Sequence, residues 1–118
     1  MALATQIVVI TVAVLHICFL VLEMFFWDKP LGMQVFGQPL AVAKASKVLA
    51  ANQGLYNGFL TAGLIWGLLS GFEGLSIEIF FLSCIVVAGV FGGLTVNRKV
   101  LVVQALPASL GLVLLLLS

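Results

Sequence analysis

The chain has 118 residues, of which 64% are hydrophobic and only 8% are charged, and its mean hydropathy is +1.34. Soluble domains contain about 45–50% apolar and about 25% charged residues, so this composition excludes a water-soluble fold and indicates an integral membrane protein. The net charge of +1 and the lack of any basic run give no reason to expect a nucleic-acid partner.

Four apolar stretches are long enough to cross a bilayer, whose hydrocarbon layer of ~30 Å requires about 20 helical residues. We predict an all-α, polytopic membrane protein with one domain, residues 1–118, that forms a bundle of four transmembrane helices. The predicted helices cover about residues 3–27, 40–70, 77–96 and 100–117, and the second begins with a cytoplasmic extension. Because residues 1–15 contain no Lys or Arg and the first stretch continues to Trp27, we expect a retained helix and not a cleaved signal peptide.

The charged residues predict how the helices are oriented. All Lys and Arg residues fall in the predicted first and third loops, at Lys29, Lys44, Lys47, Arg98 and Lys99. The second loop contains Glu73 and no basic residue, and Glu78 follows at the start of the third helix. Because basic loops stay on the cytoplasmic side, we predict a multi-pass protein of the cytoplasmic (plasma) membrane with both termini outside.

Small residues recur at four-residue spacing along the second predicted helix, at Ala50, Gly54, Gly58 and Ala62. Gly89 and Gly93 repeat the spacing on the third helix. Such faces allow two helix backbones to approach closely in lipid, where packing drives association. They predict close packing within the bundle and a homo-oligomer formed through these faces.

The first predicted helix carries two ionisable side chains. His16 lies eleven residues before Trp27, roughly 16 Å along a helix and near the middle of the bilayer, and Glu23 shares nearly the same face. We treat His16 and Glu23 as candidate catalytic residues that carry a proton, and Trp27 as an interfacial aromatic residue that contacts a bound molecule. The simpler alternatives are a neutral His16 hydrogen-bonded to a neighbouring helix and a Glu23 carboxylate that reaches water.

Further polar side chains lie at a similar predicted depth. With Trp27, the candidate substrate-binding residues are Asn52, Gln53, Tyr56, Asn57 and Gln104. Pro107 follows Gln104, removes a helical hydrogen bond and predicts a kink. If these side chains only join helices, each contributes about 0.6 kcal/mol. The outer half offers few polar residues, so the pattern favours a pocket at the cytoplasmic leaflet over a pore.

The predicted function is to bind or act on a lipophilic small molecule in that polar pocket, in contact with membrane lipids. One alternative is a small proton-coupled transporter or exporter that works as an oligomer, and another is an accessory or structural subunit. No metal site is predicted, because His16 and Glu23 are about 10.5 Å apart along the helix. Haem bound through His16 is the remaining cofactor candidate, although no Cys-x-x-Cys-His attachment sequence is present.

Three stretches of the chain resemble a family of small bacterial membrane proteins that is catalogued as domain of unknown function thirteen hundred and four. These are His16–Trp27, Val48–Leu60, which contains Asn-Gln-Gly-Leu-Tyr-Asn-Gly-Phe, and Gln104–Ala108. The resemblance covers essentially the whole chain. It implies a four-helix integral protein of the bacterial inner membrane, and it implies no activity.

Overall fold

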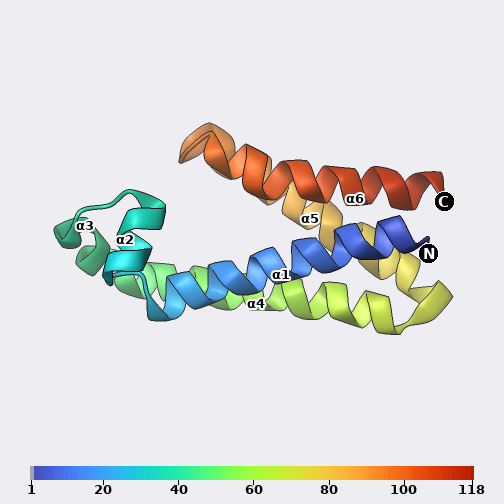
Figure 1. Cartoon of the computed structure of the whole chain (residues 1–118), viewed down its shortest axis with the longest axis horizontal. Helices are drawn as coiled ribbons and strands as arrows, with labels where there is room; N and C mark the ends of the chain where they lie inside the picture. The colour runs from blue at the N-terminus through green and yellow to red at the C-terminus, as the bar shows by residue number, and fades with distance from the viewer. Residues whose placement is uncertain (1) are drawn as a thin grey trace. The chain divides into compact units, whose positions relative to one another are not determined.

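A computed structural model describes residues 2–118, which are all-α and confirm that part of the prediction (Figure 1). These residues form six α-helices: α1 (Leu3–Phe25), α2 (Pro30–Phe36), α3 (Leu40–Ala45), α4 (Lys47–Leu69), α5 (Gly74–Thr95) and α6 (Leu106–Leu117). A 3-10 turn at Gly71–Glu73 precedes α5, and a π-helical turn at Leu101–Ala105 precedes α6. Within the described chain, the segments Leu3–Phe25 and Gly71–Thr95 are long and apolar enough to cross a membrane.

The contacts divide the chain into two compact units. One unit comprises Met1–Ala13 and Ala62–Ser118, and the other comprises Val14–Thr61. Helices α1 and α4 each contribute residues to both units. The first unit therefore contains α5 and α6, whereas the second contains α2 and α3.

In the first unit, α5 and the turn that leads into α6 form a close antiparallel hairpin. A Cβ on Gly89 would lie 2.6 Å from the backbone nitrogen of Ala105, and a Cβ on Gly93 would overlap the side chain of Leu101. Because Gly89 faces Ala105 whereas Gly93 faces the earlier residue Leu101, the two segments run antiparallel. Glycine at these positions allows the two backbones to approach more closely than any other residue would permit.

A π-helical turn lies just before Pro107, the residue at which the sequence predicts a kink. Pro107 has no N–H group, and its ring clashes with the carbonyl of residue 103 in a regular α-helix. The chain widens over Leu101–Ala105, and the N–H group of Leu106 donates to the carbonyl of Leu101, five residues back. This spacing replaces the α-helical pattern immediately before the proline.

In the second unit, the helical segment that follows Pro39 is interrupted at Ser46, between α3 and α4. The hydroxyl of Ser46 donates to the carbonyl of Val42 at 2.7 Å and accepts the indole N–H of Trp27 at 3.0 Å. Serine competes with the helix backbone for hydrogen bonds through its side chain. Contact with Trp27 therefore stabilises a break that the run of helix-forming residues does not predict.

Candidate functional site

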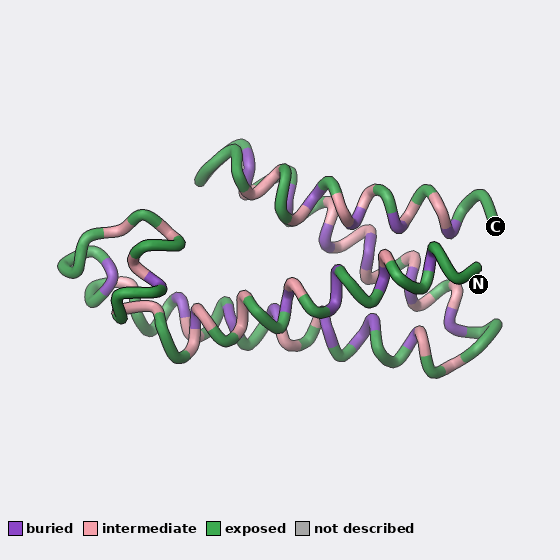
Figure 2. Tube along the Cα trace, in the orientation of Figure 1, coloured by how far each residue is buried: buried purple, intermediate pink, exposed green. Residues whose placement is uncertain are grey.

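Helix α1 buries one face along its whole length, and that face carries polar side chains. The buried residues of this helix are Thr5, Val9, Val12, Ala13, His16 and Glu23 (Figure 2). His16 is fully buried, and its ring meets the edge of Phe19 with the ring centroids 5.3 Å apart. The seven-residue spacing thus places His16 and Glu23 on the same buried face, although two helical turns separate them.

Helix α4 approaches α1 through a glycine beside Glu23. A Cβ on Gly54 would lie 3.2 Å from the Cβ of Glu23 and 3.2 Å from the carbonyl oxygen of Leu20. The missing side chain therefore brings the two helix backbones into close contact. Three residues later, on the same buried face of α4, Asn57 points at α1.

Glu23 and Asn57 form a direct hydrogen bond between the two helices. The amide Nδ2 of Asn57 donates to Oε1 of Glu23 at 2.5 Å, and the exposed fractions of the residues are 8% and 4%. An amide that donates to a buried carboxyl group fixes the orientation of that group and satisfies one of its oxygens. This contact joins two of the predicted site residues in one place.

The other predicted residues of this unit lie on its surface. Asn52 and Gln53 are exposed, and Tyr56 has an exposed fraction of 56% and packs beside Phe59. Gln104 lies in the other unit, where it is half-buried in the π-helical turn. The described contacts therefore bring Glu23 and Asn57 together, with His16 on the same face of α1, and leave three polar side chains on the outer surface of α4.

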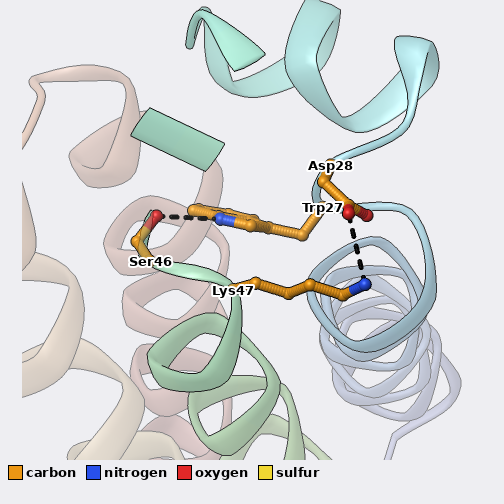
Figure 3. A network of polar contacts seen from close by, with 4 residues as sticks. All are labelled: Trp27, Asp28, Ser46 and Lys47. Carbon is orange, nitrogen blue, oxygen red and sulfur yellow. Dashed lines mark hydrogen bonds and ion pairs between the residues drawn. The ribbon is translucent and has the colours of Figure 1, made fainter. Parts of the chain in front are cut away.

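Trp27 lies among contacts that join the end of α1 to the start of α4 (Figure 3). Its indole N–H donates to Ser46, and its ring packs against Phe36 with the centroids 4.8 Å apart. Next to it, Nζ of Lys47 lies 3.2 Å from Oδ2 of Asp28. Trp27 thus has a structural role in the loop region besides any contact with a bound molecule.

The ion pair between Asp28 and Lys47 predicts a pH dependence of stability. The hydrogen bond from Lys47, supported by the charge of that residue, lowers the pKa of Asp28 from its usual 3.8. A carboxyl group with a lowered pKa stabilises the fold above its usual pKa and loses that contribution as pH falls through and below 3.8. We expect Asp28→Asn to unfold at a slightly lower temperature than the wild type at neutral pH, and at the same temperature at about pH 2.

Thermal unfolding in detergent, followed by circular dichroism, measures this difference. Lys29→Gln is the control, because it changes a neighbouring charge and leaves the Asp28–Lys47 pair in place. A difference between Asp28→Asn and the wild type that persists unchanged at low pH would contradict the assignment.

A second buried carboxyl group belongs to Glu78, which the sequence places at the start of the third helix without marking it as a site residue. Glu78 is fully buried. The buried face of α5 consists of Gly74, Glu78, Leu82, Ile85, Gly89 and Gly93. Counting back from the two predicted packing glycines in steps of three and four residues arrives at Glu78, so the helical period contained the signal.

The described residues, 2–118, contain no group of three or more His, Cys, Asp and Glu side chains that could hold a metal ion. Cys18 is exposed and Cys84 is half-buried, and both are free thiols. The candidate chemistry of the second unit is therefore that of a buried carboxyl group, an amide that orients it and a buried imidazole.

Comparison with known proteins agrees with the resemblance in the sequence. The chain is 30% identical over 115 residues to a protein of Lactococcus lactis subsp. lactis (strain IL1403) named "Uncharacterized protein YpaA", covering 96% of this chain and 97% of the relative. No solved structure matches the chain. The family described as "Protein of unknown function (DUF1304)" matches residues 10–116, nearly the whole length, and the chain belongs to this family.

Proposed function

We propose that the protein crosses the bacterial cytoplasmic membrane four times, with its basic loops in the cytoplasm and both termini outside. The two long apolar segments support two of these spans, and the shorter apolar segment Leu101–Leu117 supports a third. Helix α4 has 23 residues, as many as α1, and is less apolar because it contains Lys47, three amide side chains and four glycines. The placement of all basic residues in two predicted loops supports the orientation.

Within this membrane protein, we propose that the second unit binds or acts on a lipophilic small molecule at the cytoplasmic leaflet. The hydrogen bond between Glu23 and Asn57 is the observation that carries the proposal. An ionisable group inside a membrane is costly, and Gly54 alone already allows the two helices to pack closely. Close packing of α1 and α4 therefore does not require a buried carboxyl group, and Glu23 is a candidate proton carrier.

The roles in such a site follow from the geometry. Glu23 carries the proton, and Asn57 orients its carboxyl group through the direct hydrogen bond. His16, fully buried on the same face of α1, is the second candidate for proton transfer. The exposed Asn52 and Tyr56 are available on the surface of α4 to contact the polar end of an amphipathic molecule in the lipid.

A second candidate function is proton-coupled transport by an oligomer. The observation that favours it is the burial of Thr5 and Glu78, because buried polar side chains then occur in both units of the chain. Polar groups along more of the chain suit a transport path better than the outer half with few polar residues that the sequence predicts.

Extraction and mass spectrometry of the molecules that remain bound to the purified protein test the proposed function. We expect the wild type, purified in a mild detergent, to retain a lipophilic compound in a fixed ratio to protein. The double variant Glu23→Leu/Asn57→Leu replaces both hydrogen-bonding partners with apolar side chains of similar size, so it should fold and lose the compound.

Tyr56→Phe serves as a control for the surface of α4, because it removes one hydroxyl group and leaves the buried pair intact. A compound that is retained equally by the wild type and the double variant would show that the buried pair binds nothing. If neither protein retains a compound, the accessory-subunit interpretation is favoured. Proton uptake into vesicles that contain the wild type, but not the double variant, would favour transport.

A further inference from the structure

Glu78 occupies an enclosed position between α4 and α5. Its exposed fraction is 0%. A Cβ on Gly67 of α4 would overlap the carboxyl group of Glu78, and a Cβ on Gly74 of α5 would overlap the carbonyl oxygen of Gly67. Two glycines therefore create the space that the side chain fills, and they bring the two helix backbones together beside it.

The carboxyl group of Glu78 lacks the partners that an ionised carboxylate requires. Neither of its oxygens has a hydrogen-bond partner among residues 2–118. The backbone of Leu68 lies beside the group without completing a hydrogen bond. Burying a carboxylate without donors costs several kcal/mol even after the protein relaxes, whereas a neutral acid avoids most of that cost.

No positive charge in the described part of this unit compensates for Glu78. Its other charged side chains are Glu73, which is exposed, and Arg98 and Lys99, which follow the far end of α5. The helix between residues 78 and 95 is roughly 25 Å long, so both basic residues are beyond the reach of a direct contact. Cys84 is the other titratable side chain of α5, and a thiol supplies no positive charge that could stabilise a carboxylate.

We propose that Glu78 is a proton-binding site, in which a neutral carboxylic acid is held between α4 and α5. A proton fits the site because the side chain is fully enclosed and neither of its oxygens has a hydrogen-bond partner among the described residues. Glu78 lies in a different unit from Glu23, so this inference rests on its own contacts and not on the proposed function. The enclosed carboxyl group holds its proton where no described cation lies beside it to stabilise the ionised form.

A lipid-soluble carbodiimide tests the proposal, because it reacts with protonated carboxyl groups inside membranes. The acid adds across one C=N bond of dicyclohexylcarbodiimide: its proton goes to nitrogen and its oxygen bonds to the central carbon. An oxygen-to-nitrogen acyl shift then gives a stable N-acylurea, so the adduct contains all atoms of the reagent and nothing leaves. We expect peptide mapping by mass spectrometry to find this adduct on Glu78 when the protein is in phosphatidylcholine vesicles near neutral pH, with less adduct as pH rises.

Matched variants and reagents decide the interpretation. Glu78→Gln should lose the adduct and keep the thermal stability of the wild type, because a neutral amide resembles a neutral acid in size and charge. Glu73→Gln should leave the adduct on Glu78 unchanged, because Glu73 is exposed.

Three results would overturn the proposal. The first is an adduct that forms only after unfolding in sodium dodecyl sulphate and never in vesicles. The second is a reaction of Glu78 with a water-soluble carbodiimide as fast as that of Glu73, which indicates a hydrated carboxylate. The third is protection of Glu78 by sodium ions at constant pH, which indicates a metal-ion site.

Discussion

Asn57→Leu is expected to lower the free energy of unfolding by about 2 kcal/mol, a roughly thirty-fold change in the folding equilibrium constant. The substitution removes the donor of the hydrogen bond to Glu23 and leaves that carboxyl group buried with one partner fewer. An average interhelical hydrogen bond in a membrane contributes about 0.6 kcal/mol. The larger expected loss arises because an ionisable group is left without its partner.

Adding Glu23→Leu to Asn57→Leu should restore most of that stability, because an apolar pair needs no hydrogen bond. Unfolding in mixed micelles of increasing sodium dodecyl sulphate content measures all four proteins, namely the wild type, the two single variants and the double variant. The effect of the double variant minus the sum of the two single effects then gives the energy of the Glu23–Asn57 contact. Additive losses in the double variant would show that Glu23 and Asn57 do not interact energetically.

Gly89→Val is expected to lower the free energy of unfolding by about 3 kcal/mol, near the upper end of the cost of overpacking. Its Cβ would lie 2.6 Å from the backbone nitrogen of Ala105 and 2.8 Å from the Cβ of that residue. Neither atom can move without shifting the π-helical turn. The hairpin of α5 and α6 must therefore open or deform to accept the new side chain.

Gly92→Val is the matched control in the same helix. A Cβ there would come within 3.0 Å of one atom only, a terminal methyl of Val100, which a small side-chain movement can relieve. Thermal unfolding in detergent should show a large decrease for Gly89→Val and a change within about 1 kcal/mol for Gly92→Val. Equal effects of the two variants would mean that the hairpin is not closely packed at Gly89.

The sequence predicts the all-α class and the family because both depend on features that are local in the chain. A dominance of apolar residues in long runs favours helices, and the residues that carry the family resemblance lie within the matched range 10–116. Pro107 likewise marks its own disruption of the last helix. It does not reveal that the residues before it form a π-helical turn, which packs against Gly89.

Which residues form the candidate site is harder to predict from the sequence than the fold class, because burial depends on which face of a helix meets a neighbour. Gln53 and Asn57 are four residues apart, yet Gln53 is exposed and Asn57 is buried. Helical spacing alone therefore does not predict which of the two side chains is buried. Ser46 interrupts a run of good helix formers, and there its hydroxyl accepts the indole N–H of Trp27 from a distant part of the sequence. Each of these outcomes requires contacts between segments that no local pattern encodes.

The two contacts from the end of α1 to the start of α4 have a consequence for the segment between them. The indole of Trp27 bonds to Ser46, and Asp28 pairs with Lys47. These two side-chain contacts hold together the ends of the segment that connects α1 to α4. Extending a flexible loop whose ends are already joined adds only about 0.6 kcal/mol for each doubling of its length. We therefore expect residues inserted in the exposed turn between α2 and α3 to leave the contacts between α1 and α4 intact.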